Sequence, residues 1–139
     1  MTYEGFDLHA AMTTNPISMF LRSLLYKRMA LANLKKIQRL SPALQNEIAG
    51  KVADFINLAG VASNEALLYD FLATAVQQRQ AAIAAGATSL ADARWAAAAL
   101  SESWCGAKLA ATKRQISDAT ASTITQAIEQ FARGHRDEN

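Results

Sequence analysis

The sequence predicts an all-α fold, a single-domain bundle of four to five antiparallel helices over residues 1–139. Alanine, the best helix former, occurs 30 times, whereas glycine occurs six times and proline twice. Apolar residues recur at helical spacing between a few Pro, Gly and Asn positions that delimit each helix. The length of 139 residues suits one domain that buries its own hydrophobic core.

The two prolines mark the starts of the first two helices. Asn15 and Ser41 are good N-cap residues, and each precedes a proline, which suits the first helical position. We therefore expect a helix over about 16–40, preceded by an N-terminal arm over residues 1–14. The apolar side of this helix changes direction near Met29, so the helix either bends there or packs its two halves against different neighbours.

Glycine and asparagine delimit the next two helices. The second is expected from Pro42 to Gly60, and the third from Ser63 or Asn64 to about Ala85. Both carry an apolar stripe at the helical period, so each is expected to pack one side against the core.

The segment "INLAGVASNEALLYDFL" has the spacing of a helix-turn-helix motif. The helix that would enter the DNA carries Glu65 and Asp70 and has no basic residue before Arg79. Acidic side chains at that position oppose contact with phosphates. The charge pattern therefore favours two core helices joined by a short turn.

The last third of the chain contains either one long helix or two. Ser89 begins a segment with the spacing of a capping box, and Ser117 offers a second helix start. A break at Ser117 gives a fifth helix that ends at Arg133, whereas a single helix over 90–133 is the alternative. We expect residues 134–139 to form a frayed tail.

Trp95 and Trp104 are nine residues apart, so they project from nearly opposite sides of one helix. Two explanations follow. The helix is central and wrapped by the others, or one tryptophan is exposed and belongs to a protein interface, where this residue is enriched. The usual burial of tryptophan favours the first. Cys105, next to Trp104, is predicted to be a small core hydrophobe.

Several classes of function lack their sequence signature. The chain contains no HExxH, GxSxG, Gly-rich phosphate loop or paired-carboxylate motif. His9 and His135 stand near the two ends without the partners of a catalytic triad or a metal site. The single cysteine permits neither an internal disulfide nor a CxxC metal motif. We therefore expect no catalysis, no metal ion and no cofactor.

The first residues predict a cytoplasmic protein without membrane association. Glu4 and Asp7 stand where a signal peptide carries positive charge. No apolar run approaches the roughly 20 residues that a membrane-spanning helix needs.

The strongest functional signal is the distribution of charge. Residues 16–40 contain six basic side chains and no acidic one, a charge of +6, so the rest of the chain carries −4 of the total +2. On a helical wheel Arg28, Lys35 and Arg39 fall within about 40° of one another, over ~16 Å of the axis, and Lys36 lies beside them. Such a stripe can follow two or three successive phosphates of a nucleic-acid strand.

Three interpretations of this stripe remain open. It is a solvated surface neutralised by Glu47, Asp54 or Asp70 from neighbouring helices, a surface for nucleic acid or another polyanion, or a surface for an acidic protein. Ordinary exposed helices mix charges of both signs, so the missing acids favour the second and third interpretations.

The sequence therefore predicts a non-catalytic binding or accessory subunit that presents helix 16–40 to nucleic acid within a larger nucleoprotein assembly. The alternative is a protein–protein interaction module, such as an inhibitor, an adaptor or a structural subunit, with self-association as a homodimer included.

Overall fold

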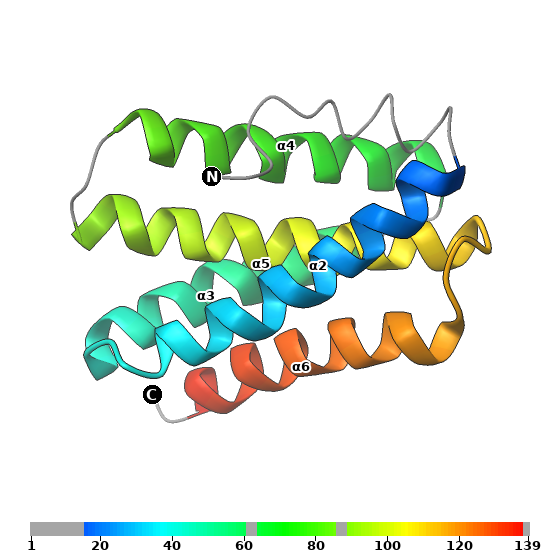
Figure 1. Cartoon of the computed structure of the whole chain (residues 1–139). Helices are drawn as coiled ribbons and strands as arrows, with labels where there is room; N and C mark the ends of the chain where they lie inside the picture. Colours follow the sequence, from blue (N-terminus) through cyan, green and yellow to red (C-terminus); the bar gives the residue numbers. More distant parts are fainter. Residues whose placement is uncertain (1–15, 61–63, 86–88, 138–139) are drawn as a thin grey trace.

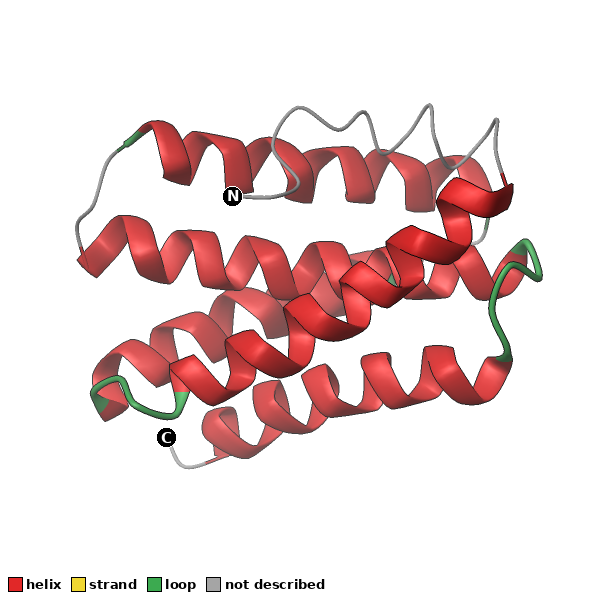
Figure 2. Ribbon diagram, in the orientation of Figure 1, coloured by secondary structure: helices red, strands yellow, loops and turns green. Residues whose placement is uncertain are grey.

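The computed structural model describes residues 16–60, 64–85 and 89–137. Over these residues it contains five α-helices and no strand, which confirms the predicted all-α bundle (Figure 1, Figure 2). The helices are α2 (Pro16–Ile37), α3 (Pro42–Ala59), α4 (Glu65–Ala84), α5 (Ser89–Thr112) and α6 (Asp118–Asp137). Consecutive helices run in opposite directions along the bundle (Figure 1). The arm predicted for residues 1–14 lies outside the described residues.

The central helix of the bundle is α5. It contacts α2, α3, α4 and α6, and Figure 1 shows it between α4 and α6, with α2 crossing in front and α3 behind. Every residue from 96 to 107 is buried. A helix that is buried on all sides needs neighbours on all sides, which confirms the first explanation given for Trp95 and Trp104.

Small side chains allow α2 to cross α5 closely. Gly106 of α5 lies against the ring of Tyr26 of α2, and a Cβ on Gly106 would overlap that ring and lie 2.9 Å from its hydroxyl oxygen. Tyr26 and Gly106 are both buried. The glycine therefore creates the space that the tyrosine ring fills.

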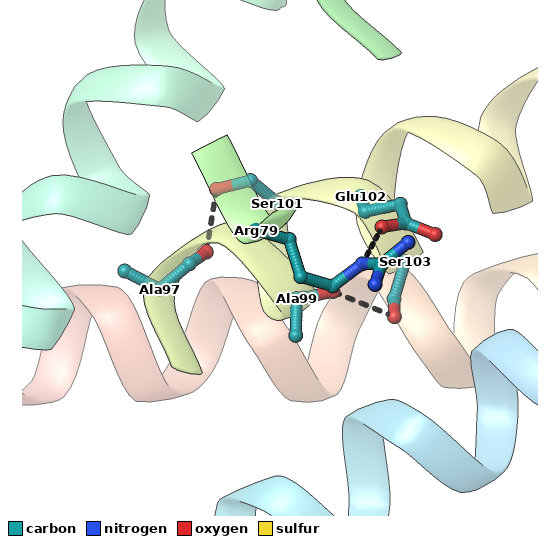
Figure 3. Close-up of polar contacts among 6 residues, drawn as sticks. All are labelled: Arg79, Ala97, Ala99, Ser101, Glu102 and Ser103. Atoms are coloured by element: carbon teal, nitrogen blue, oxygen red, sulfur yellow. Dashed lines mark hydrogen bonds and ion pairs between the residues drawn. The ribbon is translucent and has the colours of Figure 1, made fainter. Parts of the chain in front are cut away.

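A buried ion pair joins α4 to α5. Nε of Arg79 donates to Oε1 of Glu102 at 2.7 Å, and both side chains are at most 2% exposed (Figure 3). The neighbouring Ser101 and Ser103 hydroxyls each donate, at 2.9 Å, to the carbonyl four residues earlier on α5. The core of α5 thus satisfies its hydroxyls locally, while Glu102 reaches across to another helix.

Side-chain caps confirm two of the predicted helix starts. The Ser41 hydroxyl accepts from the backbone N–H of Leu44 at 3.3 Å at the start of α3. Oδ1 of Asn64 accepts from the N–H of Leu67 at 2.9 Å at the start of α4, so Asn64 is the cap of the third helix.

The chain breaks between α5 and α6, so the alternative of one helix over 90–133 is wrong. Arg114 has a φ of 58°, in the left-handed region. The N–H of Gln115 donates to the carbonyl of Ala110 at 2.9 Å, which is the reversal typical of a Schellman motif. The Ser117 hydroxyl then accepts from the N–H of Thr120 at 3.1 Å and caps α6, as predicted.

Two predicted helix ends are wrong. The first helix stops at Ile37 instead of near Leu40, because the next residues form a tight turn with hydrogen bonds of the 3₁₀ type. The last helix continues through Gly134 to Asp137, so the predicted frayed tail is helical up to that residue. An exposed glycine costs a helix about 1 kcal/mol, which does not stop propagation when each further residue adds a backbone hydrogen bond.

Candidate functional site

The packing of α2 decides which of its sides faces solvent. Tyr26, Ala30, Asn33 and Ile37 are buried and follow the i, i+4, i+7, i+11 spacing of one helix side. The helix contacts both α5 and α6, in agreement with a helix that packs on two neighbours. The apolar side chains before Tyr26, on which the predicted change of direction near Met29 depends, lie outside the side chains that the structure describes.

The four predicted anion-binding residues, Arg28, Lys35, Lys36 and Arg39, are all exposed. We call this set the basic face. Within the described part of the chain, none of the four lies within 4.0 Å of a carboxylate oxygen, so Glu47, Asp54 and Asp70 do not neutralise them through ion pairs. Lys27 is also exposed but lies on a different side of the helix.

Arg39 belongs to the turn after α2 and not to the helix itself, which corrects the predicted 16 Å helical stripe. The helical part of the basic face, from Arg28 to Lys36, spans ~12 Å of the axis. The turn is held by Gln45 of α3, whose Nε2 donates to the carbonyls of Leu40 at 2.9 Å and Gln38 at 3.4 Å. Arg39 is thus the member of the basic face that an anchored turn carries in place of the helix.

The helix macrodipole favours lysine residues at the C-terminal end of α2. Lys35 and Lys36 occupy the last turn of α2, where the partial negative charge of the helix end favours a cation by about 0.3–1 kcal/mol. Arg28 lies more than two turns upstream, where this effect has decayed. The dipole therefore accounts for Lys35 and Lys36 but not for the whole basic face.

One large apolar side chain interrupts the basic face. Leu31 is 38% exposed and lies between Arg28 and Lys35 on the same side of α2. It adds an apolar contact point to a surface that is otherwise cationic.

The two tryptophans proposed as interface residues have different environments. Trp104 is 2% exposed, and its Nε1 donates to Oε2 of Glu129 at 3.1 Å, while Lys108 lies over its ring at 4.8 Å. This position in the core leaves Trp104 no surface for a partner. Trp95 is partly buried and packs against the core, so of the two only Trp95 retains a solvent-facing part.

Cys105 lies in the interior of α5, as predicted. Its side chain is fully buried, and its Sγ–H donates to the carbonyl of Leu68 at 3.1 Å. Burial raises the pKa of the thiol to about 12, despite the opposing effect of the Lys108 charge. At neutral pH the side chain is therefore a protonated thiol and a poor nucleophile.

Among the described residues, no group of three or more His, Cys, Asp or Glu side chains is arranged to hold a metal ion. None of the helices, over the same residues, combines the length and hydropathy needed to cross a membrane. No protein-family model, curated protein or solved structure gives a significant match to this chain.

Proposed function

We propose that this protein is a non-catalytic accessory subunit that binds the phosphate backbone of a nucleic acid through the basic face, within a larger nucleoprotein assembly. One observation carries the proposal: Arg28, Lys35, Lys36 and Arg39 are all exposed and form no ion pair with the described carboxylates. Exposed cations that no carboxylate neutralises are available to replace the counterions that surround phosphates.

The side chains of the basic face suit contact with phosphates and not with bases. The spacing of ~12 Å along α2 covers two or three phosphates, and Arg39 extends the row beyond the helix end. Tyr26, the one aromatic of residues 26–40, is 1% exposed and faces α5, so it offers no stacking platform for a base. Binding is therefore expected to be largely independent of sequence and to depend strongly on salt.

Changing Arg28, Lys35 and Arg39 together to Glu should abolish binding of duplex or single-stranded nucleic acid. For the unchanged protein with four phosphate contacts, the slope of log K against log salt should be about −3.6 on duplex and −2.8 on single strands. Fluorescence anisotropy of labelled oligonucleotides between about 25 and 200 mM salt, a range over which the Debye length shortens several-fold below its low-salt value of ~30 Å, measures both.

A matched triple variant, Lys51→Glu, Arg94→Glu and Arg133→Glu, changes the net charge by the same amount on exposed residues outside the basic face. It should lose only the small affinity that follows from net charge. The proposal is wrong if the unchanged protein binds no nucleic acid at low salt, or if the two triple variants lose affinity equally.

Leu31 supports a second candidate function, binding of an acidic protein surface. An apolar residue flanked by cations is typical of protein interfaces, in which apolar contacts are ringed by polar ones. Leu31→Ser should then weaken the binding of a protein partner, or weaken a homodimer that sedimentation detects as the protein concentration rises. It should leave the affinity for oligonucleotides unchanged. Loss of oligonucleotide affinity in Leu31→Ser would count against this candidate.

A further inference from the structure

A groove separates α3 from α4 on the surface of the bundle. The two helices each pack on α5 and have little direct contact with one another, so α5 forms the floor between them. The resulting cavity has a volume of about 510 Å³, within the range of small-molecule binding sites. No residue of the basic face lines it.

The lining of the groove is mainly apolar. Its floor and one wall are built of alanines, among them Ala81 of α4 and Ala98 of α5. At one end Phe55 and Phe71 meet edge to face, with ring centroids 5.8 Å apart. Leu58, on the rim, is 63% exposed, the largest exposed fraction among the exposed large apolar side chains of the described residues. An apolar occupant would therefore remove an unusual amount of apolar surface from water.

The dimensions favour a single extended chain over a ring system. The residues of α4 that line the groove run from Phe71 to Ala85, which corresponds to ~21 Å along the helix axis. A groove of this length suits an extended acyl chain.

One cation of the lining, Arg94, lies at the end of the groove away from Phe55 and Phe71, whereas Lys51 and Asp54 are on α3 within about one turn of Phe55. Arg94 and Lys51 are exposed cations without an ion pair among the described residues, whereas Asp54 is the one carboxylate of the lining. Arg79 pairs with Glu102, so the earlier residue Arg94 lies beside the end of α4, away from Phe71, because α4 and α5 are antiparallel. An anionic group is therefore best placed at Arg94, with its chain directed toward the phenylalanines.

We propose that this groove binds a single-chain anionic amphiphile of the fatty-acid type. The carboxylate is held by Arg94, and the acyl chain lies along the alanine floor and ends against Phe55 and Phe71. The alanines are required because larger side chains would fill the channel. This site is independent of the basic face and of the function proposed for it.

Calorimetric titration of the full chain with dodecanoate, below its critical micelle concentration, should give saturable binding of one molecule per chain. Ala81→Leu should weaken binding roughly tenfold or more by filling the channel, and Arg94→Glu should do the same by repelling the carboxylate. Dodecanol, which has the same chain without the charge, should bind roughly tenfold more weakly.

Two control variants make these losses specific. Ala84→Leu adds the same side chain at an exposed position of α4 that does not line the groove, and Arg28→Glu reverses a charge on the basic face. Both should bind dodecanoate as the unchanged protein does. The proposal is overturned by the absence of saturable binding, by equal affinity for dodecanol, or by equal effects of Ala81→Leu and Ala84→Leu.

Discussion

Gly106 is a residue whose role depends on one neighbour in space. The sequence places a glycine inside a helix, where it costs about 1 kcal/mol relative to alanine. The structure explains why the helix keeps it: the Tyr26 ring occupies the position of a Cβ. The local preference for alanine is therefore opposed by the packing of α2 on α5.

Gly106→Ala should lower the free energy of unfolding by about 1–3 kcal/mol, because the added methyl group overpacks the contact with Tyr26. Gly50 is the matched control, since it lies inside α3 and a Cβ there meets no atom within 4 Å. Gly50→Ala should raise the free energy of unfolding by about 0.5–1 kcal/mol. Urea denaturation of the two variants checks both, and equal signs would contradict the explanation.

Arg79 and Glu102 form the second contact at this scale. Removal of one partner leaves a buried charge without its counter-ion, so Arg79→Met or Glu102→Leu alone should lower the free energy of unfolding by about 3–5 kcal/mol. The double variant should lose less than either single variant, because both charges leave the core together. A double-mutant cycle by thermal or urea unfolding measures this, and additive losses would mean that the two side chains do not act as a pair.

At the scale of the element, the end of α5 carries a conformational cost. Arg114 takes the left-handed position of the Schellman motif, which glycine normally occupies, and a side chain there costs roughly 1–2 kcal/mol. This turn separates α5 from α6, and the sequence left the separation open because no glycine marks it.

Arg114→Gly should therefore raise the free energy of unfolding by up to about 1 kcal/mol, since it removes the strain at φ = 58° while adding flexibility to the unfolded chain. Arg114→Ala keeps the Cβ and removes the charge, so it should show no such gain. A comparison of the two melting curves separates backbone strain from the loss of a cation. Equal stabilisation by Gly and Ala would assign the effect to charge.

The packing of helix α2 determines which of its charged residues are exposed to solvent. Its buried side includes Tyr26 and Ile37 and faces α5 and α6, so the opposite side, with Arg28 and Lys35, is left in solvent. The sequence predicted these residues from their helical spacing. It placed Arg39 on the same helix, whereas the turn that Gln45 holds ends the helix earlier.

At the scale of the whole molecule, the centre of the bundle is closed to solvent. Cys105 reports on this closure, because it lies in α5, which is surrounded by the other four described helices. Its thiol is both inaccessible and protonated, since burial raises its pKa from 9.0 to about 12. Reaction with a thiol reagent therefore requires the helices to separate.

Labelling of the native protein with a disulfide reagent at pH 8 should be much slower than labelling of the protein in urea, because the thiolate forms only after opening. As pH rises from 9 toward 12, the unfolded thiol ionises before the folded one, so this group favours unfolding in that window. Rapid stoichiometric labelling of native protein would contradict a buried Cys105. The rate in intermediate urea should follow the population of the open state.

The sequence by itself determined the fold class and most helix starts, because these depend on local chemistry. Alanine content, the proline after Ser41 and the side-chain cap at Asn64 act within a few residues of the chain. The residue types of the basic face and the helical spacing of Arg28, Lys35 and Lys36 were predictable for the same reason, whereas the turn at Arg39 was not. The exposure of the basic face also required the packing direction of α2.

Only the tertiary structure decided which helix is central, which charges pair and where a groove opens. Arg79 lies on the same side of α4 as the buried Leu72 and Ala75, so a charged residue on an apolar stripe was a usable signal for a buried ion pair. The local sequence did not identify Glu102 as the partner of Arg79. The groove exists because α3 and α4 both pack on α5 and have little contact with each other. Such features depend on contacts between residues far apart in the chain, which local propensity does not specify.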